Sequence, residues 1–186
     1  MGSEKRATAL IVPCYIKSRW DIEGLVRLCG SIQKQSQPFD KVYFIDDASP
    51  LKYEIPNDFV EHIFLGDNGG PARARNVGIN KAISSGAQHL LFTEHDCILD
   101  SDWNREMTSF LGTTEFGAVG GMTYSWGKTL LDRYHDLNGT LAGCPESSIT
   151  SRFSALCSSA CFVMLNEPVT TVCHTTPMEK CLLWRG

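Results

Sequence analysis

The sequence predicts an α/β protein with a mostly parallel central sheet and helices on both of its faces. Two observations lead to this prediction. Short β-rich apolar runs alternate with stretches of helical periodicity in the first half of the chain, and acidic, glycine or proline residues follow each run. Repeated β-α-β units with short connections are typical of a parallel sheet covered by helices.

The first unit of this pattern is a strand followed by a helix. Residues 7–13 (ATALIVP) form a β-rich run between charged residues and a proline, as expected for a strand buried on both faces. Residues 21–35 then have apolar side chains at helical spacing, with lysine, arginine and glutamine between them. This periodicity predicts an amphipathic helix that covers the sheet.

Three further strands are expected at 41–45 (KVYFI), 62–65 (HIFL) and 89–93 (HLLFT). Between the last two, Pro71 follows two glycines. A proline in the first turn favours helix entry, so residues 72–84 are predicted to be helical. The first half of the chain therefore supplies four strands and two helices in alternating order.

The second half gives weaker patterns. Residues 117–126 (GAVGGMTYSW) are expected to form a fifth strand whose glycines permit a close approach. Residues 130–141 contain a polar cluster that either faces a ligand or forms a loop, and residues 153–165 are an apolar segment expected mainly in the core. The polar cluster consists of Asp132, Arg133, Tyr134, His135 and Asp136.

Composition excludes several classes of protein. The 186 residues are enough for one sizeable core, and a net charge of −4 with 20% charged residues argues against a basic nucleic-acid binder. No apolar run approaches the roughly 18 residues that a transmembrane helix needs. The eight cysteines contain no C-x-x-C pair, and the start of the chain lacks a signal-peptide pattern. We therefore expect reduced thiols and a cytoplasmic protein.

Acidic residues gather where the predicted strands end. The carboxyl ends of parallel strands share one edge of a sheet, where ligands bind. This places Pro13, Asp46, Asp47 and the segment 94–96 (Glu-His-Asp) on one rim. Carboxylates next to a phosphate ligand require a divalent cation, and Mg²⁺ or Mn²⁺ take oxygen ligands. The alternative is a solvated acidic turn after the fourth strand.

The order of the motifs points to one family. IVPCY, FIDDASP, NGGPARARNVGINKA and LLFTEHDCIL occur in that order over roughly residues 8–105. Together they resemble the family 2 glycosyltransferases, whose Rossmann-like GT-A fold has V-P-x-Y, D-D-x-S, A-R-N-x-G and D-x-D-type motifs. The resemblance implies a metal-dependent, inverting transferase of the hexosyl or deoxyhexosyl type. It further implies Mn²⁺ or Mg²⁺ as cofactor, a nucleotide-diphospho-sugar donor of the UDP-sugar type, and a glycan, lipid-linked or protein-linked acceptor.

The resemblance also assigns donor-binding residues. Pro13 and Tyr15 would lie against the base, with the Tyr15 ring as a stacking surface. Asp47 would accept a hydrogen bond from N3–H of uracil, while Asp46 would cap the following turn. Arg75 would approach the diphosphate or hold the acidic rim. Packing at the strand end is the alternative for Tyr15, and a solvent-facing helix position is the alternative for Arg75.

The metal motif and the general base depart from the family pattern. The motif begins with Glu94 instead of aspartate, so Glu94 would contact ribose or a metal-bound water. Asp96 is expected to bind the metal, with His95 as a neutral spacer. An inverting transferase also needs a base for the acceptor hydroxyl. Glu179 in PMEKCLLWR loosely resembles the family's E-D-x-x-L-x-x-R, although Lys180 replaces the second acid; a solvated glutamate is the alternative.

We expect a single domain over residues 1–186, with a nucleotide-sugar-binding half at about 7–105 and an acceptor-side half at about 106–186. The chain is either compact or part of a larger enzyme with further domains. A non-catalytic nucleotide-sugar-binding module or a degenerate transferase is the rival function. A nucleotidyltransferase is disfavoured, because the first strand lacks a Gly-rich loop after it.

Overall fold

The structure is a computed structural model, and it describes residues 7–55, 58–113, 118–120, 129–137, 149–150, 162–165 and 183–184. The chain divides into two compact units, Met1–Glu106 and Met107–Gly186. The predicted site residues of the first half all lie in the first unit. None of the helices in the described ranges is both long and apolar enough to cross a membrane.

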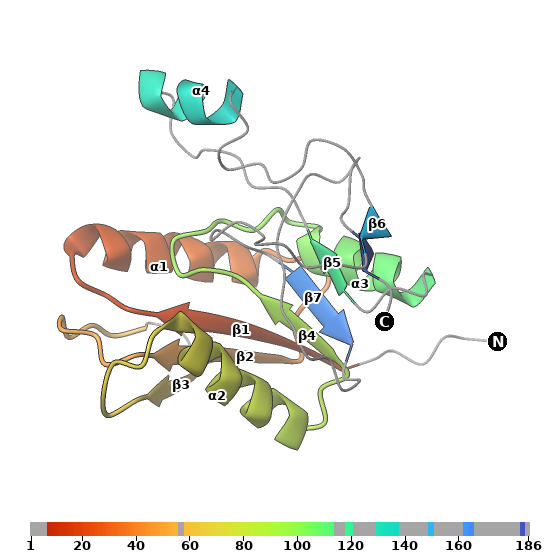
Figure 1. Cartoon of the computed structure of the whole chain (residues 1–186), viewed down its shortest axis with the longest axis horizontal. Coiled ribbons are helices and arrows are strands. Elements are labelled where there is room, and N and C mark those ends of the chain that lie inside the picture. The colour runs from red at the N-terminus through yellow and green to blue at the C-terminus, as the bar shows by residue number, and fades with distance from the viewer. Residues whose placement is uncertain are drawn as a thin grey trace. The chain divides into compact units, whose positions relative to one another are not determined.

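The first unit is a parallel α/β layer structure, which confirms the predicted fold class. Its four strands lie in the order β3-β2-β1-β4, and every described pairing between them is parallel. Figure 1 shows α1 and α2 on opposite faces of these strands. The elements are β1 (Thr8–Cys14), α1 (Arg19–Gln33), β2 (Lys41–Asp46), β3 (Glu61–Phe64), α2 (Pro71–Ser84) and β4 (His89–Phe92).

The core of this unit is centred on β1. All seven residues of β1 are buried, because the strand has a neighbour on each side and a helix layer over each face. On the α2 side the helix backbone approaches closely at Gly78. A Cβ added there would lie 2.4 Å from Cγ2 of Ile11 and 3.3 Å from Cγ1 of Ile45. Only glycine fits this contact without a shift of the helix or the sheet.

Helix α1 begins two residues before the predicted start. Ser18 is its N-cap: the hydroxyl accepts the backbone N–H of Asp21, and the Asp21 carboxylate accepts the N–H of Ser18 at 2.8 Å. This reciprocal capping box satisfies N–H groups that the first helical turn leaves without partners. The apolar periodicity begins only at Ile22, so the hydrophobic pattern alone placed the start too late.

The second unit contains short elements. Strand β5 (Ala118–Gly120) pairs antiparallel with β7 (Phe162–Leu165) and β8 (Leu183–Trp184), and β8 pairs parallel with β6 (Ile149–Thr150). The expected fifth strand at 117–126 is described only over β5. The alternative of a loop for 130–141 was wrong over its first eight residues, because Leu130–Leu137 form helix α4. Its leucines and tyrosine recur at helical spacing, a signal that the polar residues between them obscured.

Helix α3 (Trp103–Thr113) was not predicted from the sequence. Its first turn belongs to the first unit, where tertiary contacts hold it. The Asn104 backbone N–H donates to Oε1 of Gln35 at 2.9 Å, and the Trp103 ring lies 6.2 Å from the Phe39 ring. These partners are more than 60 residues away in sequence, so no local pattern indicates them.

Candidate functional site

Five of the predicted site residues, Pro13, Tyr15, Asp47, Glu94 and Asp96, lie at or just after the carboxyl ends of β1, β2 and β4. Backbone hydrogen bonds continue the sheet past the strand ends: the Asp47 N–H donates to the Cys14 carbonyl at 2.8 Å, and the Thr93 N–H to the Ile11 carbonyl at 3.3 Å. The segments that follow the three strands are therefore held side by side. The structure brings Pro13, Asp47 and the residues after β4 to one rim, as parallel strands require.

Asp46 and Asp47 are both buried but have different partners. Oδ1 of Asp46 accepts the backbone N–H of Ser49 at 2.7 Å, which caps the turn after β2 as expected. Asp47 accepts the backbone N–H groups of Gly69 at 2.9 Å and Gly70 at 2.7 Å, one on each carboxylate oxygen. A carboxylate has about four lone-pair sites, so Asp47 retains acceptor capacity beyond these two bonds.

The turn after β2 is backbone-strained and tied to the segment after β1. Ala48 adopts a left-handed conformation with φ 57°, which costs a non-glycine residue about 1–2 kcal/mol. The hydroxyl of Ser49 accepts the Ile16 N–H at 2.8 Å. The strained turn persists because the bonds of Asp46 and Ser49 fix it on both sides. Strain of this kind is commonest at functional sites.

Pro13 and Tyr15 flank the end of β1. Pro13 is buried within the strand and lies in register with Ile45 of β2. Tyr15 is half-buried, and the Lys17 ammonium lies 5.1 Å from its ring centroid. One face of the Tyr15 ring is thus in cation–π contact. The neighbouring Cys14 is excluded as a nucleophile, because burial and the Asp46 charge raise the pKa of its thiol well above the usual value.

Arg75 and Glu94 form a half-buried ion pair. The Arg75 guanidinium donates to Oε1 of Glu94, and only 17% and 18% of the two side chains is exposed. Burial raises the pKa of the Glu94 carboxyl above its ordinary value, and the charge of Arg75 offsets only part of that rise. Arg75 therefore does not face solvent. It joins α2 to the acidic segment after β4, and it occupies one oxygen of Glu94.

Asp96 differs from Glu94 in its surroundings. Its side chain is exposed, and no hydrogen bond or ion pair from another described residue reaches its carboxylate. His95 is directed to α1, where its Nε2 lies 3.9 Å from Oδ1 of Asp21. The described residues contain no cluster of three or more His, Cys, Asp or Glu that would hold a metal ion. A single exposed carboxylate is chemically compatible with Mg²⁺ or Mn²⁺ sites of the kind that use one or two carboxylates and substrate phosphates.

The loop before α2 is clamped by a pair that the sequence did not indicate. The Arg73 guanidinium makes two hydrogen bonds to the Asp67 carboxylate, at 2.6 and 3.1 Å. A Cβ added at Gly69 would lie 2.2 Å from Cδ of Arg73. The Arg73 side chain thus lies against the same glycine whose N–H binds Asp47. The pair is exposed, so it orders the loop more than it stabilises the fold.

The remaining predicted residue, Glu179, lies outside the described residues. The side chains of Asp132 and His135 are not described either, although both belong to α4. The candidate site that the structure describes is thus the rim of the first unit. It comprises Pro13, Tyr15, Asp47, Arg75, Glu94 and Asp96.

Comparison with known proteins identifies the family. The family model described as "Glycosyl transferase family 2" matches residues 9–176. This chain belongs to glycosyl transferase family 2, and its first unit has the GT-A fold. A search of curated proteins found no match.

Two solved structures show the likeness of the fold. Residues 1–349 of S. aureus TarS, in complex with UDP-GlcNAc, are 23% identical to this chain, with a TM-score of 0.53. The match covers 67% of this chain and 36% of that TarS chain. The mannosyltransferase PcManGT from Pyrobaculum calidifontis, in complex with GDP-Man and Mn²⁺, is 17% identical over 96% of this chain, with a TM-score of 0.55. The chain spans 57% of the latter.

Proposed function

We propose that this chain transfers a sugar, with inversion, from a UDP-sugar to a glycan or glycoconjugate acceptor. Its family membership supports glycosyl transfer in general, and similar folds occur with UDP, UDP-GlcNAc or GDP-Man bound. The observation that carries the proposal is the rim: the buried carboxylate of Asp47 follows β2, and Glu94 and the exposed carboxylate of Asp96 follow β4 on the other side of β1. Arg75 of α2 pairs with Glu94 there. These charged groups suit a nucleotide-sugar donor, which presents a base, a ribose and a diphosphate.

Asp47 is the residue proposed to recognise the base of the donor nucleotide. Its carboxylate is fixed by the Gly69 and Gly70 N–H groups and keeps lone pairs for one more donor. Uracil has an N3–H donor, whereas cytosine has an acceptor at N3. A fixed carboxylate at this position therefore favours a uridine nucleotide over a cytidine nucleotide. Pro13 and Tyr15 contribute the surface against which the base lies.

Arg75 and Glu94 are proposed to shape the diphosphate side of the site. Because Arg75 already pairs with Glu94, its charge neutralises the acidic segment next to the place of the phosphates. Glu94 keeps a second carboxylate oxygen for a ribose hydroxyl. This arrangement accounts for glutamate at a position where the family usually has aspartate: the longer side chain reaches Arg75.

Asp96 is the proposed ligand of Mn²⁺ or Mg²⁺. When bound, such a cation offsets the negative charge that develops on a departing nucleoside diphosphate. The exposed Asp96 carboxylate would hold one side of the cation, and donor phosphate oxygens would supply further ligands. Asp96 is oriented by the segment after β4, whose Cys97 N–H donates to the Glu94 carbonyl at 3.2 Å.

The general base is proposed to be Glu179. The acceptor hydroxyl must lose its proton as its oxygen attacks the anomeric carbon, and a carboxylate near that oxygen takes the proton. We also propose that the transferred group is a hexosyl or deoxyhexosyl group and that the acceptor is a glycan or glycoconjugate. The same holds for a single domain over residues 1–186 and for a cytoplasmic location. They rest on the sequence patterns and on the family.

Calorimetric titration tests the donor site. UDP and GDP are each titrated with Mn²⁺ and with a chelator, against the wild type, Asp96→Asn and Asp58→Asn. Asp58 is an exposed aspartate before the amino end of β3, at the edge of the sheet away from the rim, so it is the matched control. We expect UDP to bind more tightly than GDP and only weakly in the chelator. Asp96→Asn should lower the affinity for UDP at least tenfold with Mn²⁺ present and leave the unfolding midpoint unchanged.

Two results would contradict the proposal. Unchanged UDP affinity of Asp96→Asn in Mn²⁺ would remove the metal assignment. The absence of binding of either nucleotide to the wild type would favour a non-catalytic or degenerate domain.

A further inference from the structure

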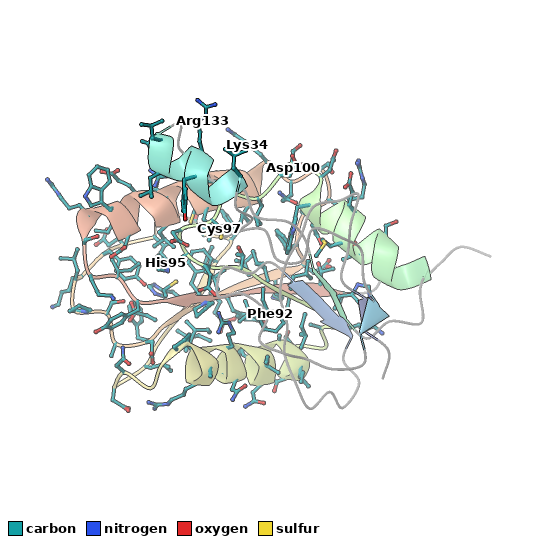
Figure 2. All side chains as sticks on the ribbon, turned by 45° about the horizontal axis from the view of Figure 1, so that its top comes forward. Lys34, Phe92, His95, Cys97, Asp100 and Arg133 are labelled. Carbon is teal, nitrogen blue, oxygen red and sulfur yellow. The ribbon has the colours of Figure 1, made fainter. Side chains whose placement is uncertain are left out.

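A stripe of residues on one face of α1 lies along residues 94–104, the segment that begins with the acidic motif. The positions of α1 and its C-terminal extension on this stripe recur every three or four residues, which places them on a single face. Figure 2 shows His95, Cys97 and Asp100 following one another along α1 toward Lys34. Four residues of the stripe contact the segment, Asp21, Gly24, Ser31 and Gln35, and the buried Leu28 lies at the position between Gly24 and Ser31.

The far end of this stripe is fastened by hydrogen bonds. The Ser31 hydroxyl accepts the backbone N–H of Leu99 at 3.1 Å. The Gln35 side chain donates to the Asp100 carbonyl and accepts the Asn104 N–H at 2.9 Å. These groups are buried or half-buried, so losing one leaves a polar group without a partner. The segment after Asp96 is therefore fixed to α1 by its backbone.

At the near end the contact is steric. A Cβ added at Gly24 would lie 3.1 Å from Cα of Asp96 and 3.2 Å from its Cβ, inside the usual carbon–carbon contact distance of about 3.5–4.0 Å. The nearest atoms belong to the backbone and to the first side-chain carbon, and neither can rotate out of the way. The backbone of the acidic segment thus rests directly on the α1 backbone.

We infer that Gly24 is a positioning residue: the absence of its side chain sets where the Asp96 carboxylate lies and hence how it binds a divalent cation. The inference rests on the proposed function, in which Asp96 is the metal ligand. The sequence gives no hint of this role, because Gly24 belongs to a helix some 70 residues before the motif. A methyl group at position 24 must push Asp96 outward or tilt α1. Mg²⁺ and Mn²⁺ sites tolerate such displacement poorly.

The test compares Gly24→Ala with Gly30→Ala. Both replace a glycine of α1 by a better helix former, but a Cβ at Gly30 meets nothing within 4 Å. UDP is held constant while Mn²⁺ is titrated, and UDP affinity is also measured in chelator. Gly24→Ala should need about tenfold to a hundredfold more Mn²⁺ for half-maximal UDP binding. Metal affinity usually falls by about this factor when a residue that orients a metal ligand is replaced. UDP affinity in chelator should stay as in the wild type, and Gly30→Ala should match the wild type in both.

A structural readout separates this inference from the proposed function. We expect the Cys97 amide, which donates to the Glu94 carbonyl, to exchange its hydrogen faster in Gly24→Ala than in Gly30→Ala. Equal exchange rates and equal Mn²⁺ requirements in the two variants would overturn the inference. If the wild type bound no metal–nucleotide complex, the proposed function would fail, while the exchange rates would still decide whether Gly24 holds the segment.

Ser31→Ala serves as a second variant in case Gly24→Ala does not fold. It adds no atom and removes the acceptor of the Leu99 N–H. It should also raise the Mn²⁺ requirement several-fold and speed exchange at Leu99. An unchanged Mn²⁺ requirement in folded Ser31→Ala would contradict the idea that α1 positions Asp96.

Discussion

At the scale of single residues, the acidic pair after β2 shows how the fold fixes the position of a carboxylate. Asp47 accepts two backbone N–H groups from the loop before α2, one of them from Gly70, whose φ is 84°. Its carboxylate is therefore fixed before any ligand arrives. Preorganised acceptors discriminate strongly between partners, because a mismatched group leaves a buried polar atom unpaired.

The first prediction compares Asp47→Asn with Asp46→Asn. An amide in place of the Asp47 carboxylate leaves one oxygen as acceptor and turns an N–H₂ toward one of its two backbone donors, whereas the oxygen of an asparagine at position 46 can still accept the Ser49 N–H. Asp47→Asn should therefore lose about 1–3 kcal/mol of unfolding free energy, and Asp46→Asn less, as measured by denaturant titration. Only Asp47→Asn should also lose its preference for UDP over CDP in binding. Equal loss of preference in both variants would show that the turn as a whole, and not Asp47, reads the base.

At the scale of secondary-structure elements, the glycine of A-R-N-V-G explains how α2 is placed. Gly78 lets the helix backbone lie against Ile11 and Ile45 of the sheet. Three residues earlier on α2, Arg75 reaches Glu94. The close approach at Gly78 thus lies about one turn of α2 away from the ion pair, and we expect it to help place Arg75.

The second prediction is that Gly78→Ala destabilises the protein. The added Cβ would overlap a branched methyl group of Ile11, whose χ1 is stiff. Overpacking of this kind costs about 1–3 kcal/mol, which exceeds the gain in helix propensity of about 1 kcal/mol. Thermal unfolding should show a lower midpoint than the wild type, whereas Gly30→Ala should show a higher one. A Gly78→Ala midpoint at or above that of Gly30→Ala would mean that α2 has room to move.

At the scale of the whole molecule, donor binding and acceptor chemistry are expected from different parts of the chain. The donor rim belongs entirely to Met1–Glu106, and the proposed base Glu179 belongs to Met107–Gly186. Substitutions of the rim residues should therefore change nucleotide affinity, while a substitution of the base should change turnover alone.

The third prediction tests this division with Glu179→Gln. Turnover of a UDP-sugar should fall about 10²- to 10⁴-fold, the usual contribution of a general base, while UDP affinity stays unchanged. Glu167→Gln is the matched control, because Glu167 is another carboxylate in the same stretch of the chain. A fully active Glu179→Gln variant would direct the search for the base to Asp132, His135 or Glu167.

Much of the fold followed from local pattern. The four strands and two helices of the first unit were predicted within about two residues, because each is an apolar run of distinct periodicity between strong breakers. The start of α1 was missed because a capping box, and not an apolar residue, defines it. Helix α3 was missed because its first turn is held by Gln35 and Phe39, both distant in sequence.

The sequence by itself determined that the chain is a parallel α/β protein with a rim of acidic residues at its strand ends, because strand direction follows from the β-α-β order. Only the tertiary structure decided which contacts each rim residue makes. It paired Arg75 with Glu94, left Asp96 exposed, tied Asp47 to Gly69 and Gly70, and laid Gly24 against Asp96. These relations join residues 19 to 72 positions apart, and such contacts depend on how helices pack on a sheet. A local pattern cannot encode that packing.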